Sequence, residues 1–402
     1  MEYRFSDKLA GLAPSAIREI FKSLVDPEII SFAAGNPAPE SFPVRELARL
    51  SAEIYRTAPV GALQYGMTEG YAPLREAVAK RQKEVFGIGK SRAAGDAFDD
   101  STIIVSGGQQ GIELACKAFC NEGDAVLCEN PTFIGALNAF RSNGAVPVGV
   151  EMWENGITPA ALEAAIAANP RAKLIYLIPT FQNPTGITTG LAARREIYEI
   201  AKRHRLPIIE DNPYGELRFA GTDVPTIKSM DTEGLVIYCS TFSKILSAGM
   251  RVGFVVAPEE ITAKMVIAKQ VEDVHTNQFF QMLCHRYMTE CDLNAHIESI
   301  RAIYRRKCAL MLECLEKELP RGVTFTRPEG GLFLWCMLPE RVDGAAFVQK
   351  ALERKVAVVP GATFDCTPGA PSRAFRLNYS TPTEEQIIEG CRRLGAAARE
   401  CL

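Results

Sequence analysis

The chain has 402 residues, of which 47% are hydrophobic and 23% are charged, and its formal net charge is −3. This length allows two lobes around a shared core, and the composition is that of an ordinary globular protein. The slightly negative charge leaves no basic excess to attract nucleic acid or an anionic membrane, so we expect neither as a partner.

Targeting signals and metal-binding patterns are not evident in the sequence. The amino-terminal segment MEYRFSDKLAGLAPS has no apolar stretch of the kind found in signal peptides. Apolar runs elsewhere, such as 235–242, have the length of a strand and are too short to span a membrane. The 12 cysteines include no C-x-x-C pair and fit no zinc signature. We expect a cytoplasmic protein without a metal site.

A charge-rich stretch at 90–100 predicts a mobile surface loop. After it, strand-like apolar runs alternate with helical patterns through the middle of the chain. This alternation indicates βαβ units and a mostly parallel sheet between helices. In chain order the predicted strands are 101–108, 124–129, 145–152, 172–180, 206–211 and 235–242, and the predicted helices are 109–123, 136–140 and 191–205.

Beyond about Pro258 the pattern changes to long helices, predicted at 268–288 and 295–319. After Pro320, four further apolar segments predict a small sheet, at 323–331, 332–338, 356–361 and 374–380. The fold class is therefore α/β, with a large domain and a smaller α/β domain. We expect an N-terminal arm over 1–45 that joins the small domain, a large domain over 46–290 and a small C-terminal domain over 291–402.

Polar residues follow the ends of five predicted strands. Because ligands of an open α/β sheet collect at the carboxyl ends of its strands, these residues are expected to converge on one site. Packing alone does not explain such a set. The segments are Ser106–Gln109, Glu129–Pro131, Asn183–Gly186, Asp211–Tyr214 and Ser240–Lys244.

Lys244 is the sharpest signal among them, because it directly follows an apolar strand instead of lying on a solvated helix face. Lysine forms Schiff bases with carbonyl compounds, and partial burial lowers its pKa enough to make it nucleophilic. Asp211 either caps a turn or pairs with the ring nitrogen of pyridoxal 5′-phosphate (PLP). Asn183 and Tyr214 could hydrogen-bond the phenolic oxygen of the same cofactor.

The glycine turn at 106–111 favours a phosphate at a helix N-terminus, although glycine also occurs in such turns for steric reasons. The turn nearly matches a dinucleotide fingerprint, with Ser106 in place of the first glycine. A dehydrogenase would leave Lys244 and Asp211 unexplained. It would also leave unexplained Arg376, whose place in an apolar strand indicates a buried anion, either a structural partner or a substrate carboxylate.

Five motifs in this order resemble the fold-type I PLP enzymes, specifically the class I/II aminotransferases, over almost the whole chain. They are N-P-T-G at 183–186, D-x-x-Y at 211–214, T-F-S-K at 241–244, G-x-R-x-G at 249–253 and F-R-L-N at 375–378. The segments 31–43 and 63–66 are similar to the branch of 2-aminoadipate and kynurenine aminotransferases and MocR-like regulators. The resemblance implies the PLP-transferase type I fold and PLP as cofactor.

The resemblance also implies roles for individual residues. Lys244 would carry the cofactor and move the proton at the substrate Cα, with Asp211 on the ring nitrogen and Asn183 and Tyr214 on the phenolic oxygen. The phosphate would be bound by Gly108, Gln109, Thr241, Ser243 and Arg251, together with Tyr65 from the second subunit of a homodimer. The substrate carboxylate would be bound by Arg376, assisted by Gly35 and Asn183, and Arg18 would meet the substrate side chain.

Three residues depart from the family pattern. Gly108 stands where relatives often have serine, which removes one side-chain contact to the phosphate. Phe133 stands where the residue that stacks on the cofactor ring is often tyrosine, and phenylalanine keeps the stacking without the hydroxyl. Thr241 replaces serine and keeps the hydroxyl.

The expected reaction moves the amino group of an L-amino acid to a 2-oxo acid, 2-oxoglutarate being the expected acceptor, by a ping-pong mechanism. One alternative on the same scaffold is a PLP-dependent β-lyase similar to cystathionine lyases. Another is a non-catalytic PLP-sensing module, which the negative net charge disfavours for a DNA-binding protein. The sequence does not identify the donor, because Arg18 suits an acidic side chain whereas Phe133, Phe333 and Trp335 suit an aromatic one.

Overall fold

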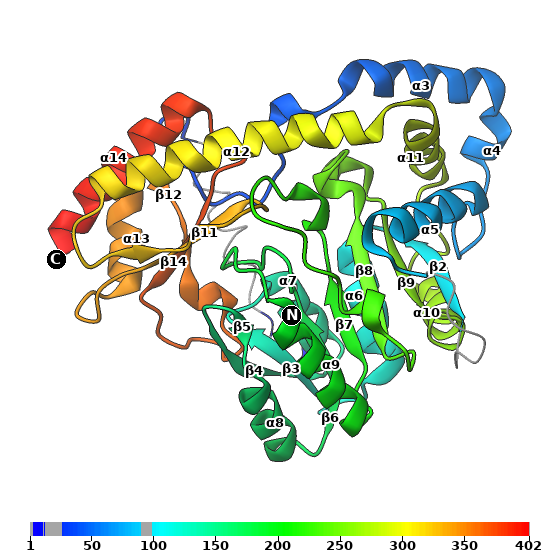
Figure 1. Ribbon diagram of the computed structural model, residues 1–402, viewed down its shortest axis with the longest axis horizontal. Helices are drawn as coiled ribbons and strands as arrows, with labels where there is room; N and C mark the ends of the chain where they lie inside the picture. The colour runs from blue at the N-terminus through cyan, green and yellow to red at the C-terminus, as the bar shows by residue number, and fades with distance from the viewer. Residues whose placement is uncertain (1–2, 11, 13–25, 90–98, 402) are drawn as a thin grey trace.

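The computed structural model describes residues 3–10, 12, 26–89 and 99–401, so the predicted loop at 90–100 lies mostly outside the described residues (Figure 1). Its centre is an eight-stranded sheet with the order β2-β9-β8-β7-β6-β3-β4-β5. The strands are β2 (Asp100–Val105), β3 (Ala125–Asn130), β4 (Val146–Trp153), β5 (Gly156–Ile157), β6 (Ala172–Leu177), β7 (Ile208–Asp211), β8 (Val236–Thr241) and β9 (Gly253–Pro258).

Five neighbouring strands of this sheet, β4, β3, β6, β7 and β8, are parallel. The sequence patterns predict no strand at 253–258, yet β9 lies there and runs antiparallel to both β8 and β2. Strand β2 therefore points in the same direction as the parallel block. The prediction of a mostly parallel sheet is confirmed, and the carboxyl ends of β2, β3, β6, β7 and β8 lie at one edge.

Helices cover both faces of this sheet, because successive side chains of its buried strands point to opposite sides. Cys128 and Tyr176 pack in one apolar cluster with α6 (Gly108–Phe119), α7 (Ile134–Ser142) and α10 (Glu259–Glu272). Their neighbours Leu127 and Ile175 pack in another with α8 (Pro159–Ala168) and α9 (Leu191–His204). At the β2 end of the sheet, α5 (Ala72–Phe86) packs on β2.

The single helix predicted at 268–288 is wrong: α10 ends at Glu272 and α11 (Gln278–Glu290) begins a new direction. Val274 between them has a φ of +65°, a left-handed conformation that a helix cannot contain. The Asn277 side chain accepts a hydrogen bond from the Phe280 amide at 3.1 Å and so caps the start of α11. The break falls in the polar stretch 272–278, in which Val274 is the one apolar residue.

The carboxyl-terminal third forms the predicted second sheet, reached through the 26-residue helix α12 (Leu293–Glu318), which Figure 1 shows running from the large sheet to the small one. This antiparallel sheet has the order β10-β11-β14-β13. Its elements and the helices beside it are β10 (Thr324–Phe325), β11 (Phe333–Met337), β13 (Val359–Pro360), β14 (Ala374–Asn378), α13 (Gly344–Glu353) and α14 (Glu384–Cys401).

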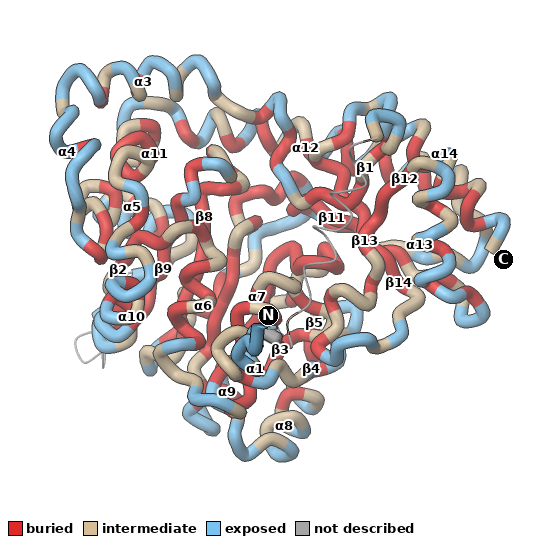
Figure 2. The backbone as a smooth tube through the Cα atoms, turned by 180° about the vertical axis from the view of Figure 1, so that it is seen from behind, coloured by how far each residue is buried: buried red, intermediate tan, exposed pale blue. Residues whose placement is uncertain are grey.

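The amino-terminal part of the chain contacts both lobes. Strand β1 (Ile30–Ser31) pairs in parallel with β12 (Val356–Ala357) beside the small sheet. Helices α3 (Val44–Thr57) and α4 (Pro59–Leu63) then lie against α11, where Figure 2 shows them largely exposed. The short helix α1 (Asp7–Ala10) lies near α7. Within the described ranges no helix is long and apolar enough to cross a membrane.

Candidate active site

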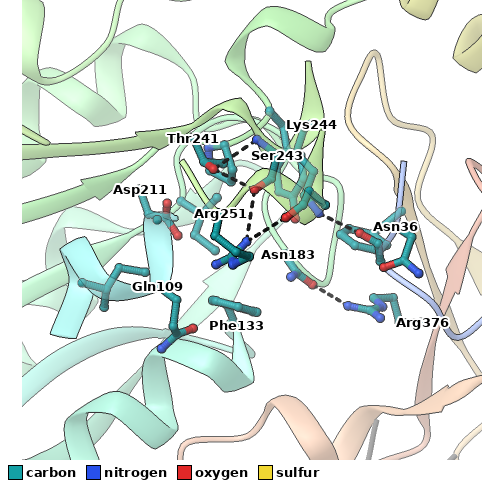
Figure 3. A pocket seen from close by; sticks show the side chains of 18 residues that line it. Asn36, Gln109, Phe133, Asn183, Asp211, Thr241, Ser243, Lys244, Arg251 and Arg376 are labelled. Carbon is teal, nitrogen blue, oxygen red and sulfur yellow. Dashed lines mark hydrogen bonds between the residues drawn. The ribbon is translucent and has the colours of Figure 1, made fainter. Parts of the chain in front are cut away.

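A cavity of about 310 Å³ opens at the carboxyl edge of the large sheet, between that sheet and the small one (Figure 3). It brings together residues that lie more than 300 positions apart in the sequence. Twelve of the residues singled out from the sequence line it: Gly35, Gly108, Gln109, Phe133, Asn183, Asp211, Tyr214, Thr241, Ser243, Lys244, Arg251 and Arg376. Phe333 also lines it, whereas Trp335 lines a different hollow.

Lys244 ends a short 3-10 helix, η4 (Phe242–Lys244), that directly follows β8. Its Nζ donates a hydrogen bond to the carbonyl oxygen of Gly35 at 2.7 Å. Burial, reinforced by the positive charges of Arg376 and Arg251, lowers the pKa of Lys244 to about 8. The neutral amine, which a nucleophile or a general base requires, is therefore more populated near neutral pH than in an ordinary lysine.

Asp211 is the last residue of β7 and is 4% exposed. One carboxylate oxygen, Oδ2, accepts a hydrogen bond from the Tyr176 hydroxyl at 2.8 Å. Burial raises the pKa of Asp211 to about 7, against the opposing effects of the Tyr176 hydrogen bond and the Lys244 charge. A carboxylate in this position can pair with a cationic group of a ligand.

Arg376 lies on β14, an interior strand of the small sheet, and is 2% exposed. Its Nη1 donates to Asn183 Oδ1 at 2.9 Å and its Nη2 donates to the Ala33 carbonyl at 2.8 Å, while Nε has no hydrogen-bond partner among the described residues. The guanidinium lies over the Phe333 ring at 4.1 Å and over the Phe364 ring at 4.9 Å. These ring contacts fix the plane of the guanidinium. Burial lowers the pKa of Arg376 to about 10, and a bound anion would stabilise its charged form.

Tyr214 follows β7 and completes the polar wall of the cavity. Its hydroxyl lies at hydrogen-bonding distance from the Asn183 side chain, and its ring meets Phe333 edge-on with the centroids 5.9 Å apart. Burial raises the pKa of this hydroxyl above its usual value, so Tyr214 stays protonated and can donate.

The turn before α6 forms an anion-binding cradle. Gly107 has a φ of +84° and lies at the N-terminus of α6, where backbone N–H groups have no helical partner. Arg251 Nη2 donates to the Ser106 carbonyl at 3.1 Å, and its Nη1 lies 3.4 Å from Ser243 Oγ. The cradle therefore combines a helix N-terminus, a hydroxyl and a guanidinium, a donor set that suits a phosphate.

The reversed direction of β9 explains how Arg251 reaches this cradle. Because β9 is antiparallel to β8, its first residue, Gly253, lies at the edge where the parallel strands end. A Cβ on Gly253 would lie 2.8 Å from the Ser240 carbonyl oxygen and from the backbone of Gly107, so only glycine allows this close approach. The residues just before β9 are thereby brought against the turn at 106–108.

One predicted residue does not line the cavity, and another lies outside the described residues. Tyr65 is 81% exposed and meets the ring of His275 edge-on at 5.7 Å, on a different surface. Arg18 lies outside the described residues. Among the residues that the structure does describe, no group of three or more His, Cys, Asp or Glu side chains is placed to hold a metal ion.

Several residues of the site carry no signal of their own in the sequence. Ile112, Ile178 and Ala248 also line the cavity, as do Asn36 and Pro213, which lie within segments singled out above. Tyr176 and Phe364 lie behind it and contact Asp211 and Arg376. Neither carries a sequence signal, because each reads as an ordinary apolar core position; only the pairing of elements distant in sequence reveals them.

Comparisons with known proteins agree with this geometry. The family model Aminotransferase class I and II matches residues 27–394. The chain is 38% identical over 403 aligned positions to an aromatic-amino-acid aminotransferase 1 of Thermococcus litoralis, covering 99% of this chain and 95% of that protein. It is 41% identical over 401 positions to a 2-aminoadipate transaminase of Thermus thermophilus, covering 99% and 97%.

Among solved structures, a Pyrococcus horikoshii kynurenine aminotransferase in complex with PMP has a TM-score of 0.93 and 37% identity, covering 98% of this chain and 97% of that chain. The predicted resemblance and the predicted PLP-transferase type I fold are thus confirmed. None of these three relatives is named a lyase or a dehydrogenase.

The geometry of the cradle predicts the effect of Gly107→Ala. A Cβ there would collide with the Arg251 guanidinium, and the backbone conformation costs a non-glycine residue about 1–3 kcal/mol. We expect the dissociation constant of PLP, measured by fluorescence titration of the cofactor-free protein, to rise about tenfold or more. Gly108→Ala is the matched control, because a Cβ there finds no atom closer than 3.9 Å. Equal affinities of the two variants would contradict the role of the turn.

Proposed function

We propose that this chain, which belongs to the aminotransferase class I and II family and is a PLP-dependent aminotransferase, transfers amino groups in the cavity around Lys244. The observation that carries this placement is that one cavity unites a lysine amine, a buried carboxylate and a buried arginine with a phosphate-type cradle. When bound, PLP supplies an aldehyde for an amine and a ring that takes up the electron pair of the substrate Cα–H bond.

The residues around the cavity fit each part of this cofactor. The cradle of Gly108, Gln109, Thr241, Ser243 and Arg251 would hold the phosphate. Asp211 would pair with the ring nitrogen, because it lines the cavity and its carboxylate is held by the neutral Tyr176 hydroxyl. Phe133, at the start of α7, would stack on the ring, and Asn183 and Tyr214 would bind the phenolic oxygen.

Gln109 and Phe133 owe their places to Gly135, since a Cβ there would collide with both side chains. The Gln109 side chain donates to the Gly135 carbonyl at 2.8 Å, which leaves its backbone amide for the phosphate. At Gly108 the nearest atom to an added Cβ is 3.9 Å away, so the absence of the family's serine is not forced by space.

Lys244 would serve both as the attachment point of the cofactor and as the base that moves a proton at the substrate Cα. The lowered pKa supports both roles, since the neutral amine is the reactive form. Two half-reactions would follow in ping-pong order: an L-amino acid leaves as its 2-oxo acid, and a second 2-oxo acid takes up the nitrogen. We propose 2-oxoglutarate as that acceptor.

Arg376 would bind the α-carboxylate of either substrate, with Asn183 and Gly35 beside it. Its unpartnered Nε and its placement between two aromatic rings support a bidentate contact with a planar anion. Arg18 would meet the substrate side chain. Phe133 and Phe333 give the cavity apolar walls, so a donor panel should include aromatic amino acids, kynurenine and 2-aminoadipate, which appear in the names of the relatives.

We propose that two chains form a homodimer through an apolar surface composed of Val60, Leu63, Tyr65, Val271 and Val274. The exposed fractions are 75% for Val60, 72% for Leu63 and 86% for Val271, and exposed apolar groups of this kind mark protein contacts. The contact between Tyr65 and His275 joins the two stretches of this surface. Tyr65 would then reach the phosphate bound by the partner subunit.

The domain division and the location of the protein are further proposals. We propose an arm over 1–45, a large domain over 46–290 and a small domain over 291–402, and the pairing of β1 with β12 supports the association of the arm with the small domain. We propose that the enzyme acts in the cytoplasm, without nucleic acid or membrane as a partner, in line with its slightly negative net charge.

Lys244→Ala tests the placement of the reaction. We expect amino transfer to fall by roughly 10²–10⁴-fold or more, because one amine carries both attachment and proton transfer. The circular dichroism spectrum should not change. Borohydride reduction of the wild-type holoenzyme should fix the cofactor ring on the peptide containing Lys244, as mass spectrometry would show. The matched control is Lys264→Ala, which removes an exposed lysine of α10. Appreciable turnover by Lys244→Ala would refute the placement.

Arg376→Ala tests the carboxylate site. We expect the KM for the amino acid to rise roughly 100-fold or more, since each charge-assisted hydrogen bond contributes about 1.5–3 kcal/mol. The affinity for PLP should stay close to that of the wild type. Arg327→Ala, which removes an arginine whose side chain is 59% exposed, is the control and should change neither quantity. Loss of PLP with an unaltered KM would show that Arg376 serves the cofactor instead.

Mixed dimers test the contribution of Tyr65. Tyr65→Ala alone should weaken PLP binding about tenfold, as expected for the loss of a hydrogen bond to a charged group. Mixing Tyr65→Ala with Lys244→Ala chains should restore one complete site, made of Lys244 from one chain and Tyr65 from the other. Mixing Arg251→Ala with Lys244→Ala chains should restore none, because both residues lie in the same chain's cavity. Equal recovery in both mixtures, or a monomer in sedimentation velocity, would contradict shared sites.

A further inference from the structure

Tyr176 places a polar group in an otherwise apolar layer. It lies on β6 and is 0% exposed, in the cluster between the sheet and helices α6 and α7. The Phe140 ring meets it edge-on at 5.5 Å. A buried hydroxyl costs free energy unless it is hydrogen-bonded, so its partner is informative.

That partner is the carboxylate of Asp211. The Tyr176 hydroxyl donates to Oδ2 of Asp211 at 2.8 Å, and this is its one hydrogen bond within the described part of the chain. The sheet register creates the contact, because Tyr176 stands opposite Ile209 in the β6–β7 ladder, and Ile209 and Asp211 share a face. Tyr176 is thus the diagonal neighbour of Asp211, and its hydroxyl contacts the carboxylate from the core side, away from the cavity.

Asp211 needs such a donor in order to remain ionised. Burial favours its protonated form, and Glu129 on β3 is a second buried carboxyl near it. The other titratable groups that face it are Cys239 on β8, Tyr214 and Lys244, of which Lys244 alone favours the carboxylate by its charge. A hydrogen bond from a neutral hydroxyl favours the carboxylate without adding a competing cation.

We propose that Tyr176 is a positioning residue of the reaction, which keeps the Asp211 carboxylate ionised and turned so that it can hold the ring nitrogen of the cofactor in its protonated form. This inference rests on the proposed function, because it takes Asp211 as the partner of the ring nitrogen. Tyr176 itself lies behind Asp211 and does not line the cavity. It acts on the reaction only through that carboxylate.

The test is Tyr176→Phe, which removes the hydroxyl and keeps the ring that packs on Phe140. The first readout is the ¹⁵N resonance of the holoenzyme loaded with [¹⁵N]PLP. We expect the wild type to show a protonated ring nitrogen and the variant to shift toward the unprotonated position. The second is steady-state kinetics, in which kcat should fall about 10- to 100-fold while the KM for the amino acid changes little.

Tyr238→Phe is the matched control. Tyr238 is also 0% exposed and lies on β8, the strand on the other side of β7. Its hydroxyl accepts a hydrogen bond from Asn212 at 2.9 Å instead of contacting Asp211. The ¹⁵N resonance of the cofactor ring in the Tyr238→Phe holoenzyme, and the kcat of this variant, should match those of the wild type. If Tyr238→Phe produced the same shift as Tyr176→Phe, the effect would belong to any buried hydroxyl and the proposal would be overturned.

Asp211→Asn separates this proposal from the one on which it rests. We expect Asp211→Asn to remove the protonated ring-nitrogen signal. If Asp211→Asn does so and Tyr176→Phe does not, the role of Tyr176 is refuted while that of Asp211 stands. If the signal persists in Asp211→Asn, the assignment of Asp211 to the ring nitrogen fails, and the role of Tyr176 fails with it.

Discussion

This site depends on one constraint: three ionisable side chains are buried with neutral hydrogen-bond partners in place of oppositely charged ones. Lys244, Asp211 and Arg376 border one cavity, and each is held by a neutral group: a backbone carbonyl, a tyrosine hydroxyl, and an asparagine side chain with a second carbonyl. Burial consequently shifts all three pKa values toward the uncharged forms. Under the proposed function, a cofactor and a substrate that bring opposite charges to Asp211 and Arg376 would remove this penalty.

The direction of the strands determines which groups meet at this cavity. Parallel strands place the residues after β2, β3, β6, β7 and β8 at one edge, and these residues supply the lysine, the carboxylate and the glycine turn. The reversed strand β9 adds Arg251 from the opposite chain direction, in contact with Ser243 and the turn at 106–108. One antiparallel strand in a parallel sheet therefore completes the group of donors around the turn at 106–108.

The small sheet contributes one wall of the cavity. Arg376 reaches the cavity from β14, and Asn183, in the loop after β6, accepts a hydrogen bond from its guanidinium, so this bond is one of those that join the two lobes. Phe333 and Phe364, also in the small lobe, hold the guanidinium between their rings. The amino-terminal segment supplies the carbonyls of Ala33 and Gly35 to Arg376 and Lys244. Three stretches of the chain thus fix the relative positions of Arg376 and Lys244.

The sequence by itself determined the alternation of strands and helices, the aminotransferase family and twelve residues of the cavity, because polar residues after apolar strands leave a local signal at Lys244 and Asp211. It did not determine the break between α10 and α11, because a left-handed backbone is rare for a β-branched residue such as Val274 and no local pattern predicts it. Only the tertiary structure placed Tyr65 on an exposed surface and put the Tyr176 hydroxyl on Asp211. The physical reason is that register and strand direction decide contacts between distant residues, and neither is written in local sequence.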